Sequence, residues 1–337
     1  MKRIITLIIL ISSLTFVPTL YAGKPKYEIK FATVAPEGSA WMNVMHELDE
    51  EVRAKTGGEV GFKIYPGGVQ GDEIDVLRKM RYGQLHSAGF TGYGLGEILP
   101  EVRILELPFL FNSKEEIDHI CKLFYDTFDA AFREKEYVLL GWAEVGYVYI
   151  FANKPLKNVH DLKGTRMWTW EGDKLALALF EGLGVKPLPL SLPEVLTGLQ
   201  TGMLDAVYIS PLGAVSLQWF TRVKYMNIQP ITNAAGAVLM TKKQFDKIPA
   251  DKQKILLEIS RRYLRELTLK SREDNRLSIE QMEKSGITIL DPPNKEEMDA
   301  FHKVGMQVKK QLTGKLFSET LLLEIEQALD DFRTQEE

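Results

Sequence analysis

Strand-like and helix-like hydrophobic spacings alternate through the first ninety residues. Residues 27–33 alternate apolar and polar side chains, which predicts a strand, and residues 41–52 place apolar side chains at helical spacing. A second strand at 60–64 and a helix at 72–83 repeat this order. Such an alternation predicts an α/β fold with parallel sheets and helical crossovers.

A similar unit follows the turn-rich segment 155–164. Residues 173–183 have helical spacing and residues 185–190 are extended. Ser191, with Glu194 three positions later, forms a capping box that begins another helix. The order of elements in the first unit therefore recurs in the second.

Two stretches of the chain resemble each other directly. In 76–85 and in 195–204, an apolar helix face ends at a glycine and a leucine follows shortly afterwards. In this register Thr91 corresponds to Ser210. We interpret the match as one helix–glycine–strand unit in each of two lobes. The alternative is a chance agreement, because such joins are common.

This interpretation predicts a binding cleft. Ligands of open α/β sheets lie beyond the carboxyl ends of the strands, so two facing sheets would bring 90–93 and 208–211 to opposite walls. A site shared between two lobes closes by hinge motion.

The division into lobes follows from the same pattern. We predict a first lobe of 23–148 with about 234–270, and a second lobe of 149–233 with about 271–337. The charge-rich segment from 251 to about 284 predicts one or two long helices, which could brace both lobes.

Residues 1–22 are typical of a secretory signal peptide. Lys2 and Arg3 precede an apolar run that is too short for a membrane span, and small residues follow it. A retained anchor is the alternative. Cleavage would remove two positive charges and no acid, so the formal charge of −4 would become −6. We therefore predict an exported protein that is soluble after cleavage.

Composition and charge narrow the class of protein. The mildly acidic balance argues against the basic face that nucleic acids require. Cys121 is the single cysteine, so an internal disulfide is excluded and the apolar core must hold the fold together.

The sequence lacks the motifs of common catalytic and cofactor sites. Gly92, Gly94 and Gly96 follow a strand, but the spacing of the dinucleotide fingerprint is missing, which favours a turn near a cleft wall. Neither a G-x-S-x-G elbow nor a phosphate-binding G-x-x-x-x-G-K is present. We predict no cofactor, metal or catalytic residue, because no histidine pairs at ligand spacing with another histidine or the cysteine: His46, His86, His119, His160 and His302.

Several blocks resemble one family in the family's order. They are Leu107–Phe111, Lys154–Leu156, Asp161–Trp168, Leu199–Asp205 and Val223–Tyr225. Together they are similar to the dicarboxylate-receptor-like solute-binding proteins of tripartite ATP-independent periplasmic (TRAP) transporters. The resemblance implies a two-lobed periplasmic binding protein fold with a long bracing helix. It also implies closure over a solute, delivery to a permease with a small and a large membrane subunit, and transport driven by an ion gradient.

The sequence departs from this family at its charged positions. Members usually hold a ligand carboxylate with an arginine at the position of Trp168, and many have a second arginine near Val148. Where members often have an asparagine, this chain has Ile209 or Ser210. A buried carboxylate needs a charged or multiply hydrogen-bonding partner. The resemblance therefore implies a solute other than a simple dicarboxylate.

We predict instead a pocket with aromatic walls for a flat, apolar or weakly charged solute. Arg166 shares a face with Trp168 if 166–170 is extended, and it could partly replace the missing arginine. Trp41 is a further candidate, although it also fits a buried helix stripe. The candidate ligand-binding residues are Trp168, Trp170, Tyr208, Ser210, Thr91, Phe90, Tyr93, Glu37, Arg166 and Tyr149.

Other functions remain open on the sequence alone. A receptor of the same build could serve a sensor or another transporter, and an exported enzyme could carry an unrecognised site. Each aromatic candidate could be a core residue. Long helices with charged faces also leave a homodimer open.

Overall fold

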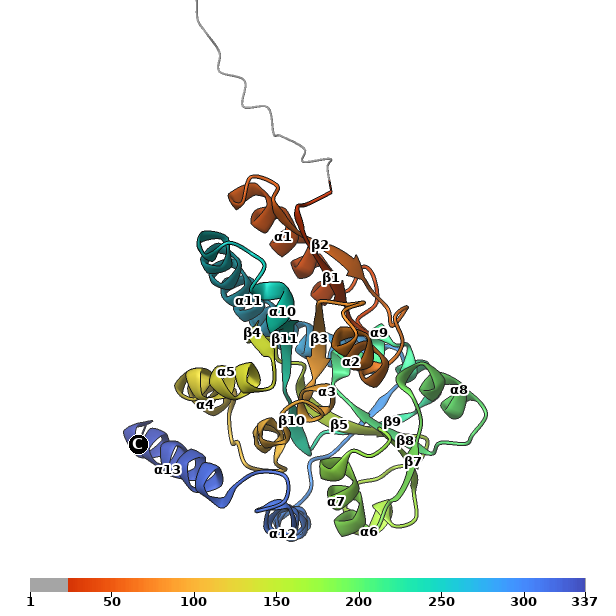
Figure 1. Cartoon of the computed structure of the whole chain (residues 1–337). Coiled ribbons are helices and arrows are strands. Elements are labelled where there is room, and N and C mark those ends of the chain that lie inside the picture. The colour runs from red at the N-terminus through yellow and green to blue at the C-terminus, as the bar shows by residue number, and fades with distance from the viewer. Residues whose placement is uncertain (1–23, 337) are drawn as a thin grey trace, which may run out of the picture.

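The computed structural model describes residues 24–336, so the predicted signal peptide at 1–22 lies outside the described residues. The chain folds around two β-sheets flanked by helices (Figure 1). The elements that build the first lobe are β1 (Tyr27–Ala32), α1 (Ala40–Lys55), β2 (Val60–Tyr65), α2 (Glu73–Arg81), β3 (Ser87–Thr91), α3 (Gly92–Gly96), the 3-10 helix η1 (Pro100–Glu106), α4 (Lys114–Leu123), α5 (Tyr125–Glu134), β4 (Tyr137–Trp142), β11 (Gly236–Thr241) and α10 (Lys242–Phe245).

The second lobe follows from the middle of the chain. Its elements are β5 (Gly146–Ala152), α6 (Val159–Leu162), β6 (Arg166–Thr169), α7 (Lys174–Leu183), β7 (Lys186–Pro189), η2 (Leu192–Glu194), α8 (Val195–Gln200), β8 (Ala206–Ile209), α9 (Pro211–Ser216), η3 (Trp219–Arg222), β9 (Tyr225–Asn227), β10 (Thr232–Ala234), β12 (Thr288–Leu290) and α12 (Lys295–Leu312).

Both sheets are mixed, whereas the sequence predicted parallel sheets. The first has the strand order β2-β1-β3-β11-β4, in which β1 is parallel to β2 and β3 but β11 is antiparallel to its neighbours. The second has the order β12-β9-β5-β8-β6-β7, and β5 runs antiparallel to β8 and β9. The physical reason is the chain path. β5 and β11 directly follow the passages between the lobes, so they enter each sheet from the opposite end.

Asp72 and Asp173 are the N-caps of α2 and α7, where each side chain accepts backbone N–H groups. The short-range features that the sequence predicted are confirmed. The capping box of Ser191 and Glu194 is present at η2. The repeated unit is α2–β3 in one lobe and α8–β8 in the other, and in both units the glycine after the helix has a left-handed φ, +72° in one and +70° in the other.

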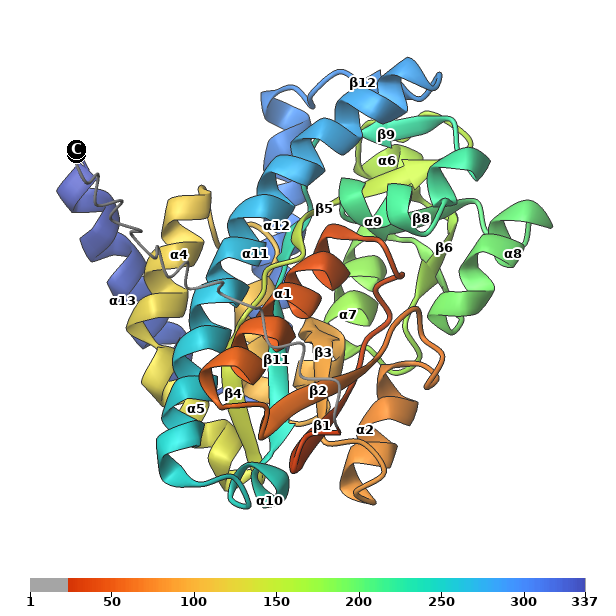
Figure 2. The same cartoon turned by 90° about the horizontal axis from the view of Figure 1, so that it is seen from above.

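The long segment forms one helix, α11 (Ala250–Lys284), of 35 residues. It contacts α1 and β4 of the first lobe and α9 of the second (Figure 2). Its predicted bracing position is therefore confirmed. Where α11 passes between the lobes its buried side chains are small and polar, including Ser271 and Asn275, and the Asn275 side chain accepts from Leu212 N and donates to Val145 O.

The C-terminal helices join opposite lobes. α12 packs on α7, while α13 (Glu319–Glu336) packs on α4, where Arg333 pairs with Glu116 at 2.8 Å. The last helix thus lies beside the first lobe, although the sequence analysis assigned 271–337 to the second. The remaining division of the chain into lobes stays a prediction.

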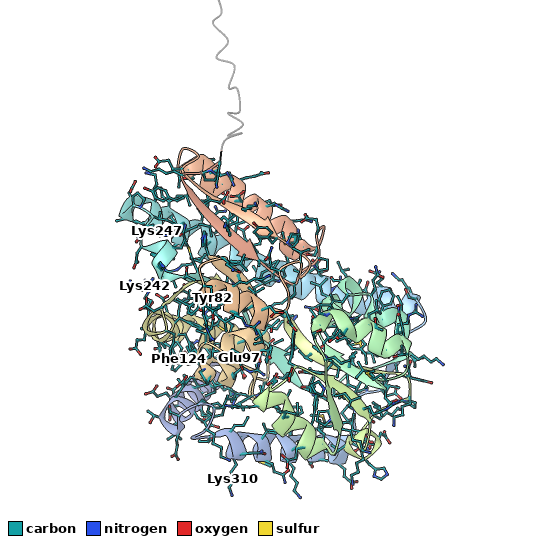
Figure 3. All side chains as sticks on the ribbon, turned by 45° about the vertical axis from the view of Figure 1, so that its right-hand side comes forward. Tyr82, Glu97, Phe124, Lys242, Lys247 and Lys310 are labelled. Carbon is teal, nitrogen blue, oxygen red and sulfur yellow. The ribbon has the colours of Figure 1, made fainter. Side chains whose placement is uncertain are left out.

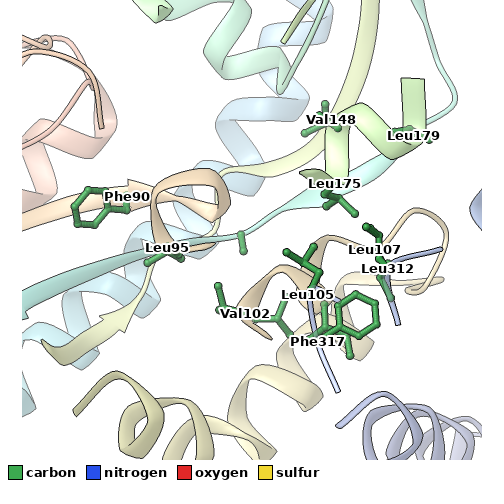
Figure 4. Packing of buried hydrophobic residues seen from close by; sticks show 14 of the residues in the cluster. Phe90, Leu95, Val102, Leu105, Leu107, Val148, Leu175, Leu179, Leu312 and Phe317 are labelled. Atoms are coloured by element: carbon green, nitrogen blue, oxygen red, sulfur yellow. The ribbon is translucent and has the colours of Figure 1, made fainter. Parts of the chain in front are cut away.

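Side chains fill the space between the elements (Figure 3), and those of the core are apolar. The largest buried cluster is continuous across the junction between the lobes (Figure 4), with Phe90 and Leu105 from the first and Val148 and Leu175 from the second. Among residues 24–336, no helix has both the length and the apolar character needed to cross a bilayer.

Candidate functional site

A cavity of about 210 Å³ lies between the two sheets, near the carboxyl ends of β3, β6 and β8. Most of its wall is apolar. Seven of the ten candidate residues line it: Phe90, Thr91, Tyr93, Trp168, Trp170, Tyr208 and Ser210. Trp41 lines it as well.

Aromatic rings form one continuous wall. Trp168 lies at its centre, with ring centroids 5.2 Å from Trp170 and 5.3 Å from Tyr208. Its other neighbour is Trp219, at 5.1 Å in an edge-to-face arrangement, and its Nε1–H donates to Leu190 O at 2.9 Å. The indole N–H is therefore already bonded, so Trp168 offers a solute its ring alone.

Tyr93 extends the aromatic wall from the second lobe to the first. It belongs to the first lobe, yet its ring stacks on Trp170 of the second with centroids 4.8 Å apart. Its hydroxyl donates to Glu171 O at 2.8 Å. At the rim, Leu192 N donates to Asp72 of the opposite lobe at 3.4 Å. The lobes are thus in contact around the cavity.

Thr91 and Ser210 occupy equivalent places, as the repeated unit predicted. Thr91 is the N-cap residue of α3 and Ser210 is the N-cap of α9. The Ser210 hydroxyl accepts from Gly213 N at 3.1 Å, and the Thr91 hydroxyl donates to Glu73. The two residues therefore line one cavity from opposite lobes.

Three candidates do not line the cavity. Arg166 is bound through its guanidinium to Asp205, because it lies at the start of β6, at the opposite end of the strand from the cavity. Glu37 is 59% exposed in its side chain and pairs with His46. Tyr149 packs behind the wall, where it pairs with Ile209 in the sheet.

Sequence reasoning missed a buried group of charged residues in the cavity wall. Arg103 Nη2 donates to both carboxylate oxygens of Asp173 at 3.0 Å, and Arg103 Nε lies 3.2 Å from Glu106. All three side chains are less than a tenth exposed. Arg103 and Glu106 belong to η1 of the first lobe, whereas Asp173 caps α7 of the second, so the ion pair joins the lobes.

The glycines of α3 make room for buried charges. A Cβ at Gly92 would overlap the Glu106 carboxylate, one at Gly94 would overlap that of Glu73, and one at Gly96 would lie 2.8 Å from the Arg103 stem. The glycine spacing seen in the sequence therefore packs a wall of the cleft against three ionisable side chains. The glycine spacing alone could not indicate these charged side chains, because nothing in the sequence places them beside the glycines.

Burial shifts the pKa of several side chains in the cavity wall. It raises the pKa of Glu106 to about 7, against the opposing effect of Arg103. It also lowers the pKa of Arg103, but the charges of Asp173 and Glu106 outweigh this effect and the net pKa is raised. Tyr208, also in the wall, has its pKa raised well above 10.0 by burial, and its hydroxyl meets no hydrogen-bond partner in good geometry among the described residues.

Glu73 gives a prediction about pH. Burial raises its pKa from 4.5 to about 7, although Thr91 N, the Thr91 hydroxyl and Gly94 N all bond its carboxylate. A raised carboxyl pKa stabilises the fold fully below pH 4.5, and this contribution is lost as the pH rises through about 7. From pH 5 to 7.5 the loss is about 2 kcal/mol. Glu106, whose pKa is also raised to about 7, adds a loss of similar size in both chains, so urea unfolding at both pH values should show a loss about 2 kcal/mol smaller in Glu73→Gln than in the native chain.

The exposed Glu37 provides the control for this experiment. Glu37→Gln should lose as much stability between the two pH values as the native chain. Equal losses in the native chain and in Glu73→Gln would contradict the assignment.

Nowhere in residues 24–336 do three His, Cys, Asp or Glu side chains gather as a group able to hold a metal ion. The cavity instead offers rings, two hydroxyl-bearing caps and one internally paired charge cluster. Such a site can enclose a small molecule between lobes.

Two lobes with a cavity between them define the class of binding proteins that close over a solute. Residues 31–312 match the family described as bacterial extracellular solute-binding protein, family 7. The chain belongs to this family.

Two curated relatives align with most of the chain. A solute-binding protein of Verminephrobacter eiseniae is 27% identical over 271 residues, which cover 78% of this chain and 79% of the relative. The 2,3-diketo-L-gulonate-binding periplasmic protein of Escherichia coli K12 is 24% identical, covering 72% of this chain and 75% of that protein.

Solved structures share the fold. A TRAP periplasmic solute-binding protein of Desulfovibrio salexigens with bound orotic acid has a TM-score of 0.83 at 17% identity, covering 90% of this chain and 98% of that one. One from Bradyrhizobium sp., in complex with galacturonate, has a TM-score of 0.81 at 25% identity, covering 90% and 99%.

Proposed function

We propose that this protein is the periplasmic receptor of a TRAP transporter and that it encloses a small organic molecule between its lobes. The cavity between the lobes, in a chain of solute-binding family 7, carries the proposal. The structurally similar proteins with orotate or galacturonate bound are described as TRAP receptors, which supports the same role here. The receptor hands its solute to a permease with small and large membrane subunits and performs no catalysis.

The solute contacts the aromatic wall. Seven cavity residues form the proposed binding surface: Phe90, Thr91, Tyr93, Trp168, Trp170, Tyr208 and Ser210. Trp168 stands where the family resemblance places a carboxylate-binding arginine, and Val148, at the other arginine position, also lines the cavity. The solute is therefore not a simple dicarboxylate.

Export precedes this function. We propose that residues 1–22 are a signal peptide that is cleaved when the chain enters the periplasm. Mass spectrometry of the protein from a periplasmic extract should give a chain that starts near Gly23.

Native mass spectrometry of freshly purified protein tests the binding role. We expect a retained molecule of metabolite size, released on denaturation, whose uptake into permease-containing vesicles requires the receptor. Uptake that is unchanged without the receptor would assign the protein to a sensor or another transporter. Binding of succinate or malate at low-micromolar concentration would contradict the aromatic site.

A further inference from the structure

The ion pair between Arg103 and Asp173 bridges the two lobes inside the cavity. Both Asp173 oxygens lie 3.0 Å from Arg103 Nη2, and both side chains are less than a tenth exposed. Since Asp173 belongs to the second lobe and Arg103 to the first, separating the lobes breaks the pair. The closed cleft thus contains a charge pair that the chain itself supplies.

The charge balance of the cavity disfavours a further anion. Among the described residues that line it, Arg103 is the one cation, and three carboxylates accompany it, those of Glu73, Glu106 and Asp173. A carboxylate ligand would have to compete with Asp173 for Arg103 or remain unpaired, and an unpaired buried charge is strongly unfavourable.

The carboxylates are also already satisfied. Glu73 accepts from Thr91 and Gly94, and Glu106 accepts from Ala235 N. Asp173 accepts from Arg103 and from the first turn of α7. No cavity carboxylate is thus left without a partner in the described residues, so the arrangement does not call for a cationic solute either.

We propose that Asp173 takes the place of a ligand carboxylate, pairing with Arg103 when the lobes close, and that the solute is an uncharged, ring-containing molecule. The rings of Trp168 and Trp170 supply the apolar contact. This inference rests on the proposed receptor function and names its class of solute.

Asp173→Asn tests the inference by gain of function. Asparagine caps helices as well as aspartate, so α7 keeps its N-cap while Arg103 loses its partner. The probes are matched acid and amide pairs, benzoate with benzamide and 1-naphthoate with 1-naphthamide, titrated by calorimetry. The native chain should bind the amides more tightly than the acids. The variant should bind the acids about tenfold to a hundredfold more tightly than the native chain does.

Two further variants keep the test decisive. Asp173→Ser also preserves the cap and is used if the asparagine variant does not fold. Glu116→Gln is the matched control, because it neutralises another buried carboxylate paired with arginine, Arg333 at 2.8 Å, outside the cavity. This control should bind acids and amides as the native chain does.

Three outcomes would overturn the inference: acids that bind the native chain as tightly as amides, no gain for any acid in either Asp173 variant, or retention of an organic cation by purified protein. The receptor function fails separately. It fails if the purified protein carries no molecule and its radius of gyration, measured by X-ray scattering, is unchanged by a broad metabolite mixture.

Discussion

Replacing Trp168 with alanine is expected to lower the free energy of unfolding by about 3–5 kcal/mol. The side chain is only 2% exposed and is surrounded by Trp170, Tyr208 and Trp219, so its removal leaves a cavity that rigid rings cannot close. It also deletes the bond to Leu190 O. Urea unfolding measures the loss, and calorimetry with the retained solute should show no binding.

Tyr82→Ala is the control for this variant. Tyr82 is an aromatic residue of the first lobe that is 78% exposed (labelled in Figure 3), and its replacement should change stability by less than about 0.5 kcal/mol. Trp168→Phe should fall between the two. Native-like stability of Trp168→Ala would show that the ring wall does not support the second lobe.

Replacing Arg103 with methionine is expected to prevent tight closure. The variant leaves Asp173 and Glu106 as buried carboxylates without their cation, which costs about 3–5 kcal/mol in the closed form. In the open form water can reach Asp173, so the penalty falls on closure. The apparent affinity for the retained solute should therefore drop by about two to three orders of magnitude.

Calorimetry and X-ray scattering test this together. Scattering should show that added solute no longer reduces the radius of gyration of Arg103→Met. Arg276→Met is the control, since Arg276 pairs with Glu273 and Glu280 on the exposed side of α11 and should have little effect. Adding Asp173→Asn to Arg103→Met should restore part of the affinity, because it removes one stranded charge. Native affinity in Arg103→Met alone would exclude a role of the ion pair in closure.

The fold could be predicted where a short stretch of sequence determines an element by itself. The helix-spaced residues of α11, the capping box at Ser191 and the repeated helix–glycine–strand unit all act over short distances, and each is present in the structure. Strand direction was not predictable in this way. Whether β5 and β11 run parallel or antiparallel to their neighbours depends on where the chain crosses between lobes, which no local spacing records.

The residues of the candidate site also divide into those that the sequence predicts and those that only the folded structure brings together. Ser210 was predicted from the repeated unit, because it follows a strand whose carboxyl end meets the cleft, and Trp168 was predicted from its place in the family resemblance; both line the cavity. Arg103 and Asp173 were not predicted as site residues, since only the meeting of η1 with α7 buries them. Arg166 was predicted in the site because alternation shows which face of a strand a side chain lies on. Alternation does not show at which end of the strand the cavity lies, and Asp205 holds the Arg166 side chain at the far end.

Helix α11 determines how the lobes can move apart. Its 35 residues include neither glycine nor proline, so it offers no point at which to bend and behaves as a stiff rod about 50 Å long. Between Leu267 and Met282 the side chains that it buries are small and polar, among them Ser271 and Ser278, so no large side chain locks a neighbour in place there. We therefore expect opening to proceed as a roll of one lobe around this rod, with the swing concentrated in the passages before β5 and β11 and in the link from α12 to α13.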